Sequence, residues 1–289
     1  MKARIKFSKT GSMRFIGHLD VMRYFQKAFR RADIALSYSQ GFSPHQLMSF
    51  ASPLGIGLSS DAEYLDIVLE DGESVSESGA QNGPDAGVSA FGGFVPRLNA
   101  VMNDEIRVKG FTLLREDSKT SMAVLAACDY LVTVKPDKCS FLTDAPRRRE
   151  AVKRLLAQGS IEISKKTKRS EKIVDIRENI YQITDERREF EDFTGISYGD
   201  MSLDLAEYEP VLYMQLTAGS VVNIKPELVL EALGRQEGEE YDWLSYQIHR
   251  IEMYADIDAK KGEVHTMSSA VPRRLVPLSE YGKDDCVDR

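Results

Sequence analysis

The chain has 289 residues, 42% of them hydrophobic and 29% charged, with a formal net charge of -7 at pH 7, which is typical of a soluble globular protein of one or two domains. No apolar run approaches the roughly 18 residues of a membrane span, and the N-terminus lacks the apolar core of a secretory signal, so we expect no membrane partner. The three cysteines are odd in number and far apart, which argues against disulfides and Cys-rich metal or iron–sulfur motifs and favours a cytoplasmic location.

The first residues predict a strand followed by a helix. Charged and apolar residues alternate over 2–8, as in a half-buried strand. A helix is expected over about 18–32, where one face is apolar and another is cationic. The apolar face consists of Leu19, Met22, Phe25, Phe29 and Ala32. The cationic face consists of Arg23, Lys27, Arg30 and Arg31.

The following segments complete a β-α-β-β-α-β order. Strands are expected at 34–39 and 62–69, with a turn between them that Gly41 and Pro44 punctuate. Further along we expect a mobile Gly/Ser-rich insertion at 71–93, a short helix at 94–101, an extended segment at 106–114 and a strand ending at Lys135. This order is typical of a ferredoxin-like module, in which two helices cover one face of a four-stranded antiparallel sheet.

The second half follows a looser version of the same plan. We expect a helix at 147–158, a hairpin around the basic segment 165–172, a strand at 211–216 and a helix at 226–233. The strand ending at Lys135 closes the first module or opens the second, and residues 241–254 fit either a helix or a final strand. The predicted fold is therefore α+β, with two ferredoxin-like (βαββαβ) modules with antiparallel sheets. The domains are residues 1–135, which include the insertion, residues 136–255, and a polar C-terminal tail at 256–289.

Two basic segments stand out in an otherwise acidic chain. Residues 1–50 contain nine Lys and Arg against two acidic residues, and residues 145–172 contain ten against three. Local cationic patches of this kind suit a polyanion or an acidic protein partner. Solvated helix and hairpin faces give the same pattern, and for any single charge run this structural explanation is the stronger one.

The sequence contains no motif that names a reaction. A phosphate-binding glycine loop, GxSxG and HExxH are all absent. His18 and His45 lie on loops of the basic module, and with Arg14 or Lys27 they would suit phosphodiester cleavage without a metal. A metal site of His18, Asp20 and His45 is a weaker alternative. Because a lone loop histidine more often forms hydrogen bonds or caps a helix, no catalytic or metal-binding residue is assigned.

Cations interleaved with aromatic residues favour RNA binding. Lys and Arg contact phosphates, while Phe and Tyr stack on unpaired bases. Each aromatic residue taken singly is more often part of the core. The candidate RNA-binding or partner-binding residues are Arg14, Phe15, Arg23, Lys27, Arg30, Arg31, Tyr38, Gln40, Phe42, Lys165, Lys166, Lys168 and Arg169.

Three segments carry a resemblance to a known family. Residues 6–67, which contain RFIGHLD and YSQGFSPH, together with KKTKRSEKIVDIRENI and AGSVVNIKPELVLEAL, resemble the radical-SAM-associated domain of unknown function. That family occurs in bacteria, alone or fused to B12-binding radical SAM proteins, often near genes for RNA processing and ribosomal proteins. The insertion at 73–93 and the C-terminal tail depart from it. The resemblance implies no catalytic residue and no cofactor in this chain, and a radical SAM partner that carries an iron–sulfur cluster and SAM.

We therefore expect a cytoplasmic, non-catalytic accessory protein. It would bind RNA (tRNA or rRNA), a radical SAM enzyme, or both, and present the substrate; DNA is not an expected partner. One alternative is a metal-independent ribonuclease that uses His18 and His45. The other is a protein-interaction module that docks an acidic partner. The expected site requires the loops at 14–18 and 40–45 to meet, with the second loop folded back over the end of the first strand.

Overall fold

The structure is a computed structural model that describes residues 1–70, 93–136, 138, 140–166, 171–199, 201–202, 210–260, 262–271 and 273–283. For residues 165 and 166 it describes the backbone alone. The expected insertion lies outside the described residues except for its last position, Gly93, and so do Lys168 and Arg169.

The helices and strands follow one another along the whole chain. The first group is β1 (Lys2–Lys9), the 3-10 helix η1 (Gly11–Phe15), α1 (His18–Arg31), β2 (Met48–Phe50), β3 (Ser59–Val68), α2 (Phe94–Asn99) and β4 (Ile106–Leu114). The second begins with α3 (Ser121–Val124), β5 (Leu125–Val134), η2 (Phe141–Thr143), α4 (Ala145–Leu156), β6 (Glu162–Lys166), β7 (Glu171–Asp175) and η3 (Arg177–Asn179). It continues with β8 (Ile180–Thr184), α5 (Arg187–Thr194), β9 (Pro210–Thr217), α6 (Pro226–Glu237), β10 (Tyr246–Asp256) and β11 (Leu275–Pro277).

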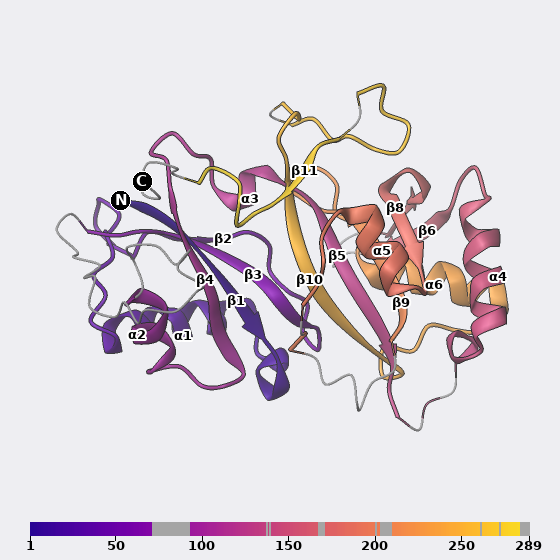
Figure 1. The fold of residues 1–289 in the computed structure, drawn as a ribbon, viewed down its shortest axis with the longest axis horizontal. Helices are drawn as coiled ribbons and strands as arrows, with labels where there is room; N and C mark the ends of the chain where they lie inside the picture. Colours follow the sequence, from indigo (N-terminus) through magenta and orange to yellow (C-terminus); the bar gives the residue numbers. More distant parts are fainter. Residues whose placement is uncertain are drawn as a thin grey trace.

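One large, mostly antiparallel sheet runs through the molecule (Figure 1). Its strand order is β4-β1-β3-β10-β5-β9-β8, with β2 on β3 and β11 on β10. The contact between β3 and β10 is parallel and places His249 opposite Ser59. The mixed α+β class is therefore confirmed, and the strands of the two halves share one continuous sheet. The strand ending near Lys135 is β5, which pairs with β10 and β9, and residues 246–256 form a strand.

The apolar face of α1 differs from the predicted one at its start. The buried residues of this helix are Val21, Phe25, Ala28 and Phe29. Leu19 was expected in this stripe but is 59% exposed. It precedes Val21 by two positions, which is roughly 200° around a helix, so the two side chains leave in opposite directions. Asp20 in the first turn and the arginines in the last turn complement the helix dipole.

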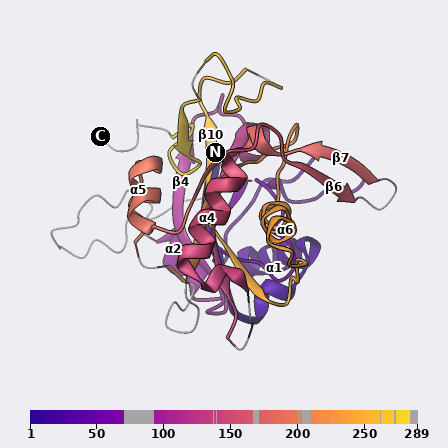
Figure 2. The same ribbon diagram turned by 90° about the vertical axis from the view of Figure 1, so that its right-hand side faces the viewer.

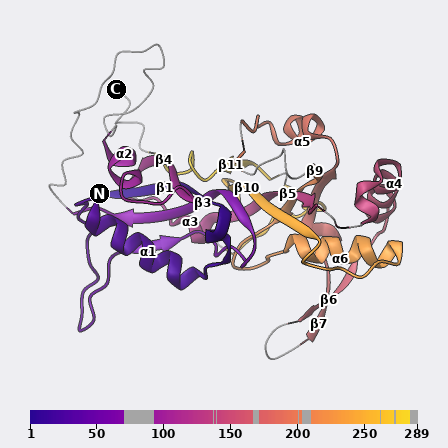
Figure 3. The same ribbon diagram turned by 90° about the horizontal axis from the view of Figure 1, so that it is seen from below.

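The helices cover both faces of the sheet. Helices α1 and α2 share one core with β1, β3 and β4, whereas α4 and α6 pack on a larger second core. Figure 2 shows α4 and α6 side by side, with the β6–β7 hairpin extending away from them. Figure 3 shows α1 and α6 on one side of the sheet and α5 on the other, where Phe190 packs with Tyr198 and Tyr213. In the described ranges, no helix combines the length and apolar character that crossing a membrane would require.

Part of the segment expected as a polar tail belongs to the sheet. Strand β11 pairs with β10, and Leu278, which follows it, is fully buried. The backbone oxygens of Leu278 and Tyr281 accept hydrogen bonds from Arg4 Nη1 at 2.7 and 3.0 Å. The apolar residues of this C-terminal segment, Leu275, Val276 and Leu278, account for its packing on the sheet, because burying them removes apolar surface from water.

Candidate functional site

A groove of about 190 Å3 lies where η1, the end of β5 and the start of α6 come together. The residues of this groove that carry charge or an aromatic ring are Arg14, Phe15, Lys135, Glu227, Tyr241, Trp243 and Tyr246. They come from four segments that are far apart in the sequence. The groove combines two residues that the sequence predicted, Arg14 and Phe15, with others that it did not single out.

Glu105 holds η1 in place. Its carboxylate accepts hydrogen bonds from the backbone N–H groups of Ser12 and Met13 at 3.0 and 3.1 Å, and from the Ser12 hydroxyl. These bonds, those from Ser12 foremost, hold the pKa of Glu105 below its ordinary value. Gly11 has φ +51°, and a Cβ there would lie 2.1 Å from Glu105 Oε1. Glycine at this position therefore lets the carboxylate approach the turn.

Arg14 reaches the groove with an unused hydrogen-bond donor. Its backbone oxygen accepts from Gly57 N at 2.9 Å, which ties η1 to the loop before β3. Its guanidinium carbon lies 4.8 Å from the centroid of the Phe15 ring, a cation–π contact, and Phe15 is 53% exposed. Arg14 Nε is buried and has no hydrogen-bond partner among the residues that the structure describes. A buried unpaired donor costs about 1–3 kcal/mol, so a ligand oxygen at this point would be stabilising.

Lys135 and Trp243 form the opposite part of the groove. The Asp242 carboxylate accepts from Leu244 N and Ser245 Oγ, both at 2.9 Å, and so fixes the turn that presents Trp243. Lys135 Nζ lies 5.9 Å from the centroid of the Trp243 ring, which is 60% exposed. Burial and the nearby positive charge of Arg14 lower the pKa of Lys135. An anionic ligand between the two cations would relieve this repulsion.

The rings beside Trp243 are fixed. Tyr241 and Tyr246 stack with their centroids 5.7 Å apart and their planes 7° from parallel. The Tyr246 hydroxyl lies 2.8 Å from Ser140 Oγ. Burial raises the pKa of both tyrosines, so they stay neutral near pH 7. The groove thus offers exposed rings for stacking, two cations, and a rigid aromatic wall.

The cationic face of α1 lies outside the groove but on the same side of the sheet as α6 (Figure 3). The cations predicted on this helix are all exposed: Arg23, Lys27, Arg30 and Arg31. Arg23 Nη1 lies 3.3 Å from Asp20 Oδ1 in an exposed pair, and Arg31 Nη2 donates to Val101 O at 2.9 Å. Exposed pairs of this kind contribute little to stability, which leaves the face available to a polyanion.

The loop after α1 presents three of the predicted residues to solvent. Tyr38 and Gln40 are exposed, and Phe42 is fully exposed near the tip. Tyr38 forms an isolated bridge with Gln46 in place of the expected strand at 34–39. His45 Nδ1 lies 2.8 Å from Ser39 Oγ, which also accepts from His45 N. His45 therefore forms its hydrogen bonds within its own loop and stabilises the conformation of that loop.

The two loops that were expected to meet lie at opposite ends of β1, so that expectation is wrong. Ser37 N donates to Val68 O and Leu69 N to Met1 O, which places the second loop at the start of β1. The loop at 14–18 follows the end of this strand, roughly 25 Å away for eight extended residues. The His18 ring instead packs edge-on against Phe50, with centroids 5.0 Å apart. His18 and His45 therefore lack the shared geometry that paired acid–base chemistry needs, and the described residues contain no cluster of three or more metal-ligating side chains.

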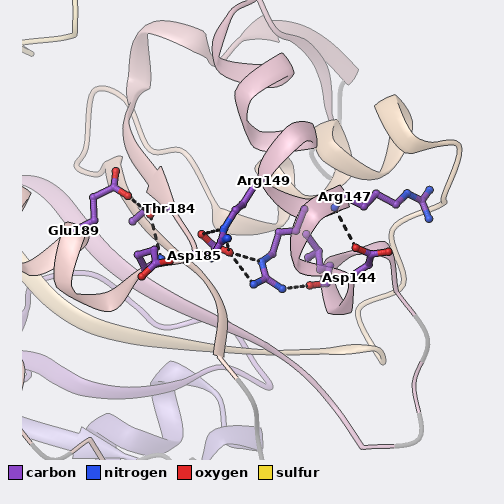
Figure 4. Close-up of polar contacts among 9 residues, drawn as sticks. Asp144, Arg147, Arg149, Thr184, Asp185 and Glu189 are labelled. Carbon is purple, nitrogen blue, oxygen red and sulfur yellow. Dashed lines mark hydrogen bonds and ion pairs between the residues drawn. The ribbon is translucent and has the colours of Figure 1, made fainter.

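Acidic side chains bind the arginines at the start of the second basic segment (Figure 4). The Asp144 carboxylate caps α4 by accepting from Arg147 N at 3.1 Å. Arg148 and Arg149 both bind the Asp185 carboxylate, at 2.8 and 2.9 Å. Acidic partners thus occupy this part of the segment, as the structural explanation of a charge run predicts. The remaining candidates, Lys165 and Lys166, lie on β6, whose hairpin projects on the same side as α1 in Figure 3.

A buried Ser–His–Asp arrangement joins β3 to β10. Ser59 Oγ lies 2.9 Å from His249 Nδ1, and His249 Nε2 lies 2.9 Å from Asp61 Oδ2. Although burial opposes it, hydrogen bonds from His249 and Ser202 lower the pKa of Asp61 to about 2. Ser59 and His249 are both buried, so no substrate reaches the serine. The arrangement fixes the parallel contact between the two halves of the sheet.

A larger cavity of about 550 Å3 lies beside β5 and β9. Its polar groups are largely satisfied by one another. His265 Nδ1 lies 2.7 Å from Asp256 Oδ2, the Tyr181 hydroxyl donates to His265 O at 2.7 Å, and the Arg273 guanidinium carbon lies 3.6 Å from the centroid of the Tyr181 ring. The groove at Arg14 and Trp243, which holds unpaired buried polar atoms, is therefore the stronger candidate site.

Comparison with known proteins gives a family but no activity. Residues 2–226 match a family described as an uncharacterized protein conserved in bacteria (DUF2344). The match includes Arg14, Phe15 and Lys135 and ends just before Glu227. A search of curated proteins found no match to the chain.

Proposed function

The chain belongs to the bacterial DUF2344 family, and we propose that it is a non-catalytic accessory protein that binds a single-stranded segment of RNA. The observation that carries this proposal is the meeting of Arg14, Phe15, Lys135 and Trp243 in one groove. Bases stack on exposed rings with about 1–3 kcal/mol each, and cations hold the phosphates between them. A duplex would keep its bases out of reach of these rings, which is why the groove favours an unpaired strand.

The proposed RNA path runs from the groove along α1. The cations of α1 are exposed and lie on the same side of the sheet as α6, whose first turn borders the groove (Figure 3). The β6–β7 hairpin, with Lys165 and Lys166, projects on this side too. A folded RNA such as tRNA or rRNA would contact these surfaces through its phosphates while one unpaired base enters the groove.

The proposal also covers the modules of the fold, the location of the protein and its partner. Each half of the chain has four strands in the order fourth, first, third, second, namely β4-β1-β3-β2 and β10-β5-β9-β8, which supports two ferredoxin-like modules within the continuous sheet. The cysteine content supports a cytoplasmic location. A radical SAM partner that carries an iron–sulfur cluster and SAM, and to which this chain presents the RNA, is supported by the sequence resemblance alone.

Replacing Trp243 by alanine is expected to weaken RNA binding by about 5- to 150-fold, because stacking contributes about 1–3 kcal/mol per base. Trp243 is the single tryptophan of the chain, so its fluorescence reports directly on base stacking. Anisotropy of a labelled single-stranded 8-mer gives the affinities. Phe193→Ala is the matched control, because this exposed ring lies on α5, on the other side of the sheet.

Reversing two charges on α1, with Arg23→Glu and Lys27→Glu, is expected to reduce the salt dependence of binding. Each phosphate contact contributes about 0.7 to the slope of log K against log salt for a single strand, so the slope should fall by roughly 1.4. The matched control reverses two exposed cations at β4, Lys109→Glu and Arg115→Glu. If the α1 variant (Arg23→Glu with Lys27→Glu) and Trp243→Ala both bind RNA as the wild type does, the RNA-binding proposal fails.

A further inference from the structure

We infer that the groove selects guanine among the four RNA bases and that Glu227 is the residue that recognises it. This inference rests on the proposed function. It starts from a single feature of the site: among the described residues that line the groove, aromatic rings and cations accompany one carboxylate, that of Glu227. Phosphates repel a carboxylate, so its presence requires a partner on the ligand that donates hydrogen bonds.

Glu227 has an unused acceptor. It lies in the first turn of α6, directly after Pro226, where the helix dipole stabilises negative charge. Its Oε2 atom is buried and accepts no hydrogen bond from any residue that the structure describes. Asp242, the acidic residue next to Trp243, differs in this respect, because its two oxygens accept from Leu244 N and Ser245 Oγ. Glu227 is therefore the carboxylate that a base in the groove would meet.

The chemistry of the base edges decides which base fits. On its Watson–Crick edge guanine places two donors side by side, the ring N1–H and the exocyclic N2–H2. Adenine and cytosine place a ring nitrogen acceptor beside their amino group, and uracil flanks its one N–H with two carbonyl oxygens. A carboxylate accepts two parallel hydrogen bonds from guanine and is repelled by the lone pairs of the other three.

The remaining groups of the groove fit a guanine nucleotide. Trp243 and Phe15 provide exposed rings for the base, and Arg14 Nε and Lys135 provide donors for its phosphate. A volume of about 190 Å3 is below the roughly 300–1,000 Å3 of pockets for larger ligands. One base, with its ribose and phosphate at the rim, is the scale of ligand that this groove admits.

The test compares four single-stranded 8-mers that differ at one position. Each is oligouridylate with G, A, C or U at the fifth nucleotide, and binding is followed by Trp243 fluorescence and by anisotropy of a 5′ label. The wild type should bind the G-containing strand about tenfold more tightly than the others, since a bidentate pair gives a discrimination of roughly 5- to 150-fold. Glu227→Gln should bind all four with affinities within about threefold, because one of the two oxygens becomes an amide that donates.

The matched control is Glu231→Gln, an exposed residue one turn further along α6, which should keep the wild-type preference. Equal binding of all four strands by the wild type overturns the inference and leaves RNA binding intact. A guanine preference that survives in Glu227→Gln also overturns it, because another group then reads the base. No response to any strand overturns the proposed function itself. The wild-type comparison needs no variant, so a variant that fails to fold does not decide the outcome.

Discussion

Replacing Arg250 by alanine is expected to lower the free energy of unfolding by about 3–5 kcal/mol. Arg250 on β10 binds Glu63 on β3 through Nε at 2.9 Å and through Nη2 at 2.6 and 2.8 Å. The side chains are 3% and 5% exposed. The alanine variant leaves the Glu63 carboxylate buried without its cation, and a buried unpaired charge is far more costly than a missing surface pair. Urea unfolding followed by Trp243 fluorescence and circular dichroism measures the loss.

Two further variants separate this effect from a general loss of packing. Arg23→Ala removes an exposed pair and should change the free energy of unfolding by at most about 0.5 kcal/mol. Arg250→Met combined with Glu63→Leu removes both charges of the pair and should recover most of the loss. A loss below about 1 kcal/mol in Arg250→Ala would contradict the view that this pair joins the two halves of the sheet.

Local patterns predicted the local elements, but they could not predict which distant segments meet. The alternation in β1 places Ala3, Ile5 and Phe7 in the core as expected. The same alternation predicts a solvated charged face, whereas Arg4 is 1% exposed because the segment around Leu278 covers it. A contact between residues this far apart depends on the register of whole strands, and no period of two or 3.6 residues carries that information.

Only part of the groove could be predicted from the sequence, because the rest depends on contacts between distant segments. Arg14 and Phe15 are adjacent in the sequence, so their combination of cation and ring was visible there. Lys135 and Trp243 reach the groove through the pairing of β5 with β10, in which Val134 lies opposite Tyr246. The signal that the sequence did contain was a lone tryptophan in a polar turn, between Asp242 and Ser245. The pairing of His18 with His45 failed because α1, a helix of 14 residues and roughly 20 Å in length, runs between their loops.

Asp129 on β5 should make the stability of the protein depend on pH. Its side chain is fully buried, and the hydroxyls of Tyr198 and Tyr254 both donate to Oδ2. Its other oxygen, Oδ1, has no hydrogen-bond partner among the described residues. Burial above all, together with the negative charge of Glu252 on the neighbouring strand, raises the pKa of Asp129 to about 7, against the lowering effect of Tyr198, Tyr254 and Gln215.

The folded protein therefore holds a proton on Asp129 that the unfolded chain has lost. The pKa rises from 3.8 in the unfolded chain to about 7 in the fold. Below about pH 4 both states are protonated and the stabilisation is complete. As the pH rises through the window from about 4 to 7 the folded state binds more protons than the unfolded state, so the free energy of unfolding falls, and it levels off above 7. The full change is about 4 kcal/mol, at roughly 1.4 kcal/mol per pKa unit.

Asp129→Asn should remove this dependence and stabilise the protein at pH 8 by about 2–4 kcal/mol. Asparagine carries no charge at any pH, and its side-chain oxygen accepts the two tyrosine O–H bonds that Asp129 Oδ2 now accepts. Urea unfolding at pH 4, 5, 6, 7 and 8 tests this: the two curves should converge near pH 4 and separate as the wild type loses stability at higher pH. Asp117→Asn, at a side chain that is 83% exposed, should follow the wild type. Equal slopes for the wild type and Asp129→Asn would show that the buried carboxyl is already ionised at pH 5, and that the two tyrosine hydroxyls outweigh its burial.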